Sequence, residues 1–156
     1  MKVILGFFSI FCILISFKAI SLEKGKWSFV KTDEYCYVGA LAIESDLPPE
    51  KNRGEYYLLV YKNIGSPDTI VQIEAGYDYK IGSDINVKID KGNYIFYTTK
   101  DLPTAAWTEE DNKIVFAMKK GLELTVTGES SRGTITNDVY TLKGFTVSYN
   151  KLIEDC

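Results

Sequence analysis

The sequence predicts a mostly-β protein, a two-sheet immunoglobulin-like β-sandwich with one or two short helices, one of them near the C-terminus. Three observations lead to this fold class. β-rich runs recur at intervals of about 10 residues, which is typical of sandwiches. Two segments have instead the apolar spacing of short helices. Two cysteines lie near opposite ends of the expected mature chain. A small closed barrel remains the alternative, because it also buries one side of each alternating strand.

Alternating apolar residues predict the strands in chain order, with turns rich in Gly, Pro, Asn and Asp between them. The predicted strands are Lys26–Lys31, Tyr35–Glu44, Glu55–Lys62, Val71–Ala75, Ile85–Ile89, Tyr94–Thr98, Leu122–Thr127 and Thr134–Leu142. The run Glu55–Lys62 is apolar at nearly every position, so we expect it to be buried on both faces. Asp90–Asn93 is a turn that makes a hairpin of the strands before and after it.

A short helix is predicted after Thr108, which has the character of an N-cap. Glu109-Glu110-Asp111 then supply acids to the first turn, Lys119-Lys120 supply bases to the last turn, and Gly121 stands at the end. The apolar run Ile114–Met118 could instead form a strand.

A second helix, or helical turn, is predicted over Phe145–Cys156 from its apolar spacing. Cys36 and Cys156 are the two cysteines left in the expected mature chain. An exported chain with an even number of cysteines is expected to oxidise them, so we predict a disulfide between the two. Its geometry requires Cα atoms about 4.4 to 6.8 Å apart. Free thiols that bind a metal are the weaker alternative, because the chain has no histidine.

Residues 1–21 are predicted to be a secretory signal peptide. Lys2 is followed by an almost unbroken apolar run, Val3 to Phe17, which is shorter than the about 20 residues of a membrane-spanning helix. Ala19 and Ser21 place small residues at the minus-three and minus-one positions of a cleavage site. We therefore expect export to the periplasm or outer cell envelope. An anchor that is not cleaved stays an alternative.

Residues 22–156 have the length of a single domain, which we expect to be one β-sandwich. They hold 16 basic and 21 acidic residues, a net charge of −5, and no basic block. This excludes the electrostatic pattern of a nucleic-acid-binding protein. It also disfavours an anionic membrane surface, so no stable membrane insertion is expected once the signal is removed.

The absence of histidine removes the Ser-His-Asp and Cys-His hydrolases, most zinc sites and the usual general base. Ser130-Ser131-Arg132-Gly133 could present a hydroxyl beside a cation, but a turn between strands explains it as well. Glu109-Glu110-Asp111 could bind a divalent cation, but a helix N-terminus explains that run too. No nucleotide-binding motif is present. The sequence therefore predicts no catalytic residue, no metal and no cofactor.

Eleven tyrosines are the conspicuous surplus. Tyrosine suits contact surfaces, because it combines a large apolar area with a polar tip. Tyr77, Tyr79, Tyr94 and Tyr97 lie near predicted turns and strand ends, and they form the candidate interaction surface. Tyrosines within Glu55–Lys62 must face alternate sides, so some of them are expected in the core and others outside it. Ordinary packing at sheet edges is the alternative for all of them.

The chain resembles the invasion-associated locus B family over most of its expected mature length, with little likeness in Leu47–Pro67. The matching residues are Trp27, Cys36, Ala106-Trp107, Ala117-Met118-Lys119-Lys120-Gly121, Leu124-Thr125-Val126, Gly133, Asp138 to Phe145, Tyr149-Asn150-Lys151-Leu152-Ile153 and Cys156. The resemblance implies a β-sandwich exported by an alphaproteobacterium, with no established enzymatic activity. It also implies that Cys36 and Cys156 clasp the fold and that Leu142–Phe145 forms a strand-to-helix corner, where Gly144 is expected to relieve crowding.

The favoured functional hypothesis is a non-enzymatic binding or interaction module whose partner is an unidentified envelope or surface protein. One alternative is a periplasmic hydrolase that uses carboxylates or a Ser-Lys pair. Another is a self-associating structural component of the envelope. The sequence indicates no oligomeric state, and the family's invasion role has no counterpart in particular residues.

Overall fold

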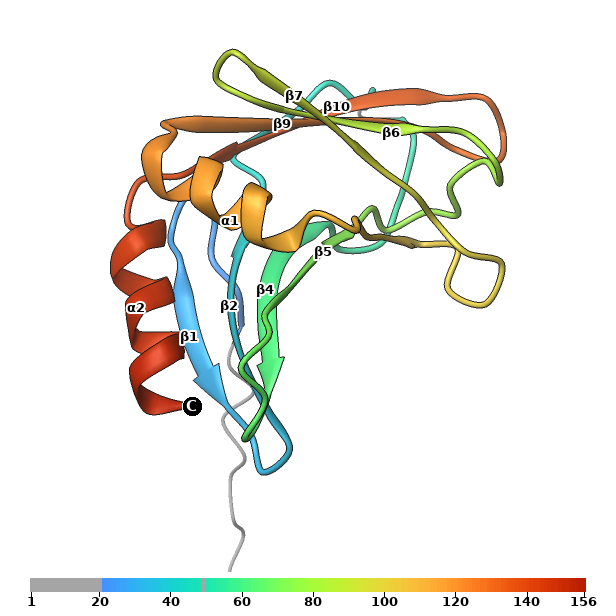
Figure 1. The fold of residues 1–156 in the computed structure, drawn as a ribbon. Coiled ribbons are helices and arrows are strands. Elements are labelled where there is room, and N and C mark those ends of the chain that lie inside the picture. Colours follow the sequence, from blue (N-terminus) through green and yellow to red (C-terminus); the bar gives the residue numbers. More distant parts are fainter. Residues whose placement is uncertain (1–20, 49) are drawn as a thin grey trace, which may run out of the picture.

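Two five-stranded antiparallel sheets form the body of the protein (Figure 1). The computed structural model describes residues 21–48 and 50–156, so the predicted signal peptide lies outside the described residues except for Ser21. The first sheet has the order β1 (Ser28–Lys31), β2 (Tyr35–Leu41), β4 (Tyr57–Asn63), β5 (Ile70–Glu74) and β8 (Ala105–Ala106). The second has the order β3 (Glu44–Ser45), β10 (Ile135–Thr141), β9 (Glu123–Glu129), β6 (Ile85–Ile89) and β7 (Gly92–Phe96).

Two helices complete the described part of the fold, α1 (Asp111–Lys120) and α2 (Phe145–Asp155). Figure 1 shows the second sheet lying across one end of the first, with α1 in the angle between them and α2 alongside β1. Helix α2 contacts β1 and β2, while α1 contacts β5 and α2. The arrangement confirms the predicted mostly-β fold with two packed sheets, and the alternative of one closed barrel is wrong.

The core lies where the inner faces of both sheets meet, and it follows from a period of two along each strand. The buried side chains of the central strands are Cys36, Val38 and Ala40 of β2, Leu58 and Val60 of β4, Val71 and Ile73 of β5, Ile85, Val87 and Ile89 of β6, and Leu124 and Val126 of β9. Their alternation confirms the predicted strands β5, β6 and β9. The β6–β7 hairpin is confirmed as well, with Ile85 opposite Phe96 and Ile89 opposite Gly92.

Strand β4 differs from its prediction. We expected it to be buried on both faces, but only Leu58 and Val60 are. Tyr57, Leu59 and Tyr61 point to the outer face of the first sheet and are half-buried. The physical reason is that no second layer of strands or helices covers that face within the described chain.

Helix α1 begins later than predicted. The Oγ1 atom of Thr108 accepts the N–H of Glu110 at 3.1 Å, and the helix starts at Asp111. The Asp111 carboxylate accepts the N–H of Val71 at 2.7 Å, which joins the start of α1 to β5. Gly121 ends the helix with φ −81°, so left-handed geometry is not the reason for glycine. A Cβ there would lie 2.8 Å from Ile89, so the close packing of helix on sheet requires glycine.

The corner before α2 needs glycine for a different reason than the one predicted. Gly144 was expected to relieve crowding, yet a Cβ at this position would meet no atom within 4 Å. Its φ of +87° is the reason, because L-residues rarely adopt that conformation. Glycine is needed here to turn the chain from β10 into α2.

Helix α2 is fixed to the first sheet by three kinds of contact. The predicted Cys36–Cys156 disulfide is formed, with the two Cα atoms 5.9 Å apart. The ring of Trp27 packs edge-on against Phe145 with centroids 4.8 Å apart, and its indole N–H donates to the carbonyl of Thr141. The hydroxyl of Ser148 donates to the carbonyl of Trp27 at 3.1 Å. Covalent, aromatic and hydrogen-bonding contacts thus hold the C-terminal helix against β2 and against Trp27, the residue before β1.

A buried ion pair joins the loop before β4 to the second sheet. Arg53 donates to both carboxylate oxygens of Asp138 on β10, and both side chains are about 5 % exposed or less. Arg53 also donates to the hydroxyl of Ser45 at 2.8 Å and lies 3.4 Å above the ring of Tyr56. Such a pair tolerates the loss of neither partner, because the remaining charge would stay buried alone.

The disulfide gives a first prediction. Replacing Cys36→Ser should lower the free energy of unfolding by about 2 to 5 kcal/mol, because the unfolded chain loses a cross-link over nearly the whole domain. Thermal unfolding with and without reductant measures this. Reductant should lower the melting temperature of the wild type and leave that of the variant unchanged. A wild-type melting temperature that does not respond to full reduction would contradict the stabilising role.

The ion pair gives a second prediction. Arg53→Met should cost about 3 to 5 kcal/mol in the free energy of unfolding, because the Asp138 carboxylate stays buried without a partner. Adding Asp138→Leu should recover part of that loss. Denaturant titrations of both variants test this. The matched control is Lys80→Met, which breaks the exposed Lys80–Glu129 pair and should cost less than about 1 kcal/mol. Equal losses from the Arg53 and Lys80 variants would refute the argument.

Candidate functional site: a tyrosine-lined groove

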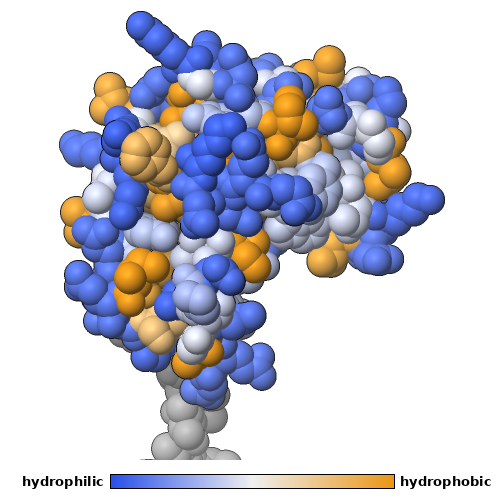
Figure 2. All heavy atoms as spheres, viewed as in Figure 1, coloured by the Kyte–Doolittle hydropathy of each residue, from blue (hydrophilic) through white to orange (hydrophobic). Residues whose placement is uncertain are grey.

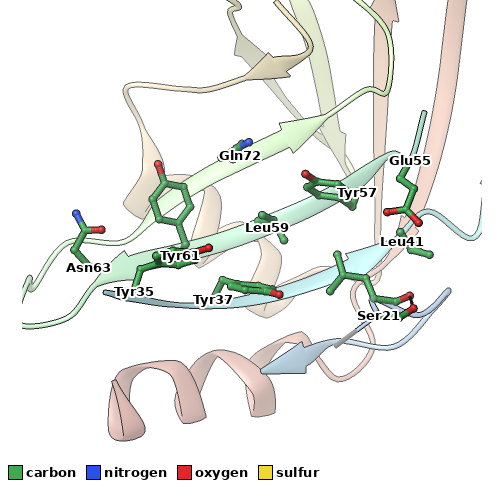
Figure 3. A pocket seen from close by; sticks show the side chains of 11 residues that line it. Ser21, Tyr35, Tyr37, Leu41, Glu55, Tyr57, Leu59, Tyr61, Asn63 and Gln72 are labelled. Atoms are coloured by element: carbon green, nitrogen blue, oxygen red, sulfur yellow. Dashed lines mark hydrogen bonds between the residues drawn. The ribbon is translucent and has the colours of Figure 1, made fainter. Parts of the chain in front are cut away.

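The outer face of the first sheet carries aromatic side chains in regular rows. The β2–β4 register sets Tyr35 opposite Asn63, Tyr37 opposite Tyr61, and Leu41 opposite Tyr57. Partners that are directly opposite on adjacent strands share a face of the sheet. Figure 3 shows these side chains standing side by side on the same face. The two neighbouring strands therefore build one surface that combines four tyrosines with leucine and asparagine side chains.

This surface is hollowed into an open groove of about 630 Å³. Its walls and floor are formed by Ser21, Leu22, Tyr35, Tyr37, Leu41, Glu55, Tyr57, Leu59, Tyr61, Asn63 and Gln72 (Figure 3). Four of these are tyrosines, of which Tyr35 is the most exposed at 40 %. A concave site of this size with apolar walls and a few polar groups has the character of a binding site.

Gly39 lies between Tyr37 and Leu41 on the outer face of β2. A Cβ at Gly39 would lie 2.5 Å from the side chain of Leu59 and 3.1 Å from that of Leu22. Leu59 of β4 and Leu22 of the N-terminal segment thus pack over bare backbone. Glycine at this position keeps the middle of the sheet face low enough for both leucines.

The groove tyrosines are neutral hydrogen-bonding groups at physiological pH. Burial, and next the nearby Tyr35, raises the pKa of Tyr37 above its usual 10. Burial, then the carboxylates of Glu74 and Glu55, raises the pKa of Tyr57. Burial also raises the pKa of Tyr61. Their hydroxyl groups keep their protons, and each can donate and accept a hydrogen bond.

The tyrosines predicted as an interaction surface lie elsewhere. Tyr79 is only 1 % exposed and packs against Tyr77, with ring centroids 5.3 Å apart, so its placement on a surface was wrong. It was misplaced because its nearness to a turn indicated exposure, whereas its backbone bridges to Ser130 and its ring fills space beside Gly128.

The other three predicted residues are not brought together with the groove. Tyr77 is half-buried, and its hydroxyl is hydrogen-bonded to that of Thr136 at 2.7 Å. Tyr94 is half-buried on β7, and the exposed Tyr97 donates to Glu109 at 2.8 Å. An interaction role for these three stays a prediction. The groove itself could have been found from the alternation of Tyr57, Leu59 and Tyr61, once their strand is known to have an uncovered face.

The polar runs considered for chemistry have structural partners. Ser130 is buried, and its hydroxyl accepts the N–H of Thr134 in the turn between β9 and β10. The acids at the start of α1 point to three different partners: Glu109 to Tyr97, Glu110 to Lys113, and Asp111 to the N–H of Val71. Within residues 21–48 and 50–156, no three His, Cys, Asp or Glu side chains gather as a metal site.

Apolar side chains are dispersed on the face of the molecule that Figure 2 shows. Figure 2, viewed as in Figure 1, shows hydrophobic patches that are separated by hydrophilic residues. Exposed examples are Phe116 on α1 and Val147 on α2. None of the helices in the described part of the chain combines the length and apolar character needed to cross a membrane.

Comparisons with known proteins agree with this fold. The crystal structure of invasion associated protein B from Bartonella henselae is similar, with a TM-score of 0.60 and 16 % sequence identity. The similarity covers 83 % of this chain and 93 % of that one, which shows a shared fold. A comparison with curated protein sequences gives no match. The model of the invasion associated locus B (IalB) protein family matches residues 32–153. This chain therefore belongs to the invasion associated locus B (IalB) family.

Proposed function

We propose that this protein is an exported, non-enzymatic binding module of the cell envelope that holds a partner protein in the tyrosine-lined groove. The observation that carries the proposal is the convergence of Tyr35, Tyr37, Tyr57 and Tyr61 on one concave face. Isolated aromatic residues on a surface need no explanation, but a contiguous hollowed patch indicates an interaction site.

The physical chemistry of the groove suits protein recognition. A tyrosine contributes a large contact area with little conformational freedom to lose, and its hydroxyl supplies a hydrogen bond at the rim. The side chains project from paired strands of a sheet, which hold them in place before a partner arrives. A preformed site loses less entropy on binding than a flexible one.

Export is supported by two features. The predicted signal peptide directs secretion, and the Cys36–Cys156 disulfide suits an oxidising compartment such as the periplasm. The hydrolase alternative is less favoured, because the hydroxyl of Ser130 and the acids beside α1 are occupied by structural hydrogen bonds and an ion pair. The self-association alternative has no specific observation in its favour.

Site-specific photo-crosslinking in intact cells tests the proposal. A photoreactive phenylalanine analogue at Tyr35, which is exposed in the groove, should crosslink the full-length protein to one partner of defined mass. The same analogue at Tyr97, which is equally exposed but outside the groove, is the matched control and should give no such product.

Combining the Tyr35 probe with Tyr37→Ala and Tyr61→Ala should abolish the product, because the aromatic wall is removed. A thermal melt of this variant should be cooperative, which separates lost binding from lost folding. A product that forms equally from Tyr97, or that survives loss of both tyrosines in a folded variant, would disprove the groove as the binding face.

A further inference from the structure

We propose that the groove binds an extended peptide segment that carries a lysine or arginine, with the cation at the end formed by Tyr57, Glu55 and Glu74. This inference rests on the proposed function and names the chemistry of the partner segment. Charge and the aromatic ring indicate the cation, and strand spacing indicates the extended peptide.

The first argument is charge. None of the eleven residues that line the groove is a lysine or arginine, while Glu55 forms part of one wall. Glu74 on β5 lies directly opposite Tyr57 of β4, on the same face of the sheet. Among the ion pairs formed by residues 21–48 and 50–156, none uses Glu55 or Glu74. One end of the groove therefore has the Glu55 carboxylate on its wall and the Glu74 carboxylate next to its Tyr57, and neither acid is in an ion pair within the described residues.

The second argument is the aromatic ring of Tyr57, which lies near both carboxylates. The face of a tyrosine ring is electron-rich and attracts a cation within about 6 Å of its centre. This protein already uses that contact, because Arg53 lies 3.4 Å above the ring of Tyr56. Burial is the main cause of the raised pKa of Tyr57, and the nearby carboxylates of Glu74 and Glu55 add to it, which places both acids close to the ring. An anionic ligand would be repelled at this end.

The third argument is the spacing of the rows. The outer-face positions Tyr35, Tyr37, Gly39 and Leu41 follow one another every second residue along β2. The seven residues of β2 span about 20 Å, which an extended chain of about six to seven residues matches. Alternate side chains of such a peptide repeat at the same interval as the rows beneath them.

The groove also offers partners for the rest of such a segment. Leu41 and Leu59 supply an apolar surface next to the acidic end. The amides of Asn63 and Gln72 line the groove and can donate to and accept from a peptide backbone. A cationic residue flanked by apolar ones at alternating positions is therefore complementary to this face.

An NMR titration of the ¹⁵N-labelled mature protein, oxidised, tests the inference. The probe is the capped peptide Lys-Ser-Leu-Ser-Leu-Ser-Lys, which has a lysine at each end so that either direction of binding is allowed. The comparison peptide carries Nε-acetyl-lysine at both ends, which removes the charge and keeps the stem. We expect shifts at Tyr37, Tyr57 and Gln72, and a dissociation constant about threefold to tenfold lower for the charged peptide.

Glu55→Gln with Glu74→Gln should remove the preference for the charged peptide. The matched control replaces two exposed acids of the second sheet, Glu44→Gln and Glu123→Gln, and should keep it. Equal binding of both peptides to the wild type, binding of neither, or stronger shifts of the same residues by an N-acetylglucosamine trimer would each overturn the inference. An unchanged yield of the Tyr35 crosslink in the Glu55→Gln and Glu74→Gln variant would overturn it while leaving the proposed function intact.

Discussion

The register between β2 and β4 is the constraint on which the rest of the structure depends. It turns Val38, Leu58 and Val60 into the core, and the period of two then leaves Tyr37 and Tyr61 on the opposite face. A slip of one residue would exchange the faces, exposing the valines and burying tyrosine hydroxyl groups without partners. Core packing and the tyrosine-lined groove are thus two results of one pairing.

A disulfide and a buried ion pair tie the first sheet to its neighbouring elements. The disulfide ties β2 to the end of α2, and the Arg53–Asp138 pair joins the loop before β4 to β10. The disulfide starts from β2 and the ion pair from the loop before β4, and these are the two strands that carry the groove. The groove therefore stands on elements whose positions are set by covalent and buried electrostatic contacts, which favours a preformed site over one shaped by the ligand.

Local pattern explains why much of the fold was predictable. The alternation of Ile85, Val87 and Ile89 left one side of a strand to be buried, and the turn after it allowed only a hairpin. Tyr79 shows where local reasoning failed. Its nearness to a turn suggested exposure, but its ring packs against the neighbouring Tyr77 and against Gly128, which is distant in sequence. The buried partnership of Arg53 and Asp138, 85 positions apart, leaves no local signal either.

The sequence by itself predicted most of the strands, the C-terminal helix, the pairing of Cys36 with Cys156 and the resemblance to the family, because periodicity, cysteine count and motif order are properties of the chain. It left a strand open as the alternative to α1, and it gave no signal for the short strand β8. Only the tertiary structure decided which apolar strand face stays open. Strand β4 is apolar on both sides, and its sequence does not distinguish a covered face from a bare one. The number of layers decides that: the second sheet and α1 pack on the inner side, so Tyr57 and Tyr61 line a groove instead of a core.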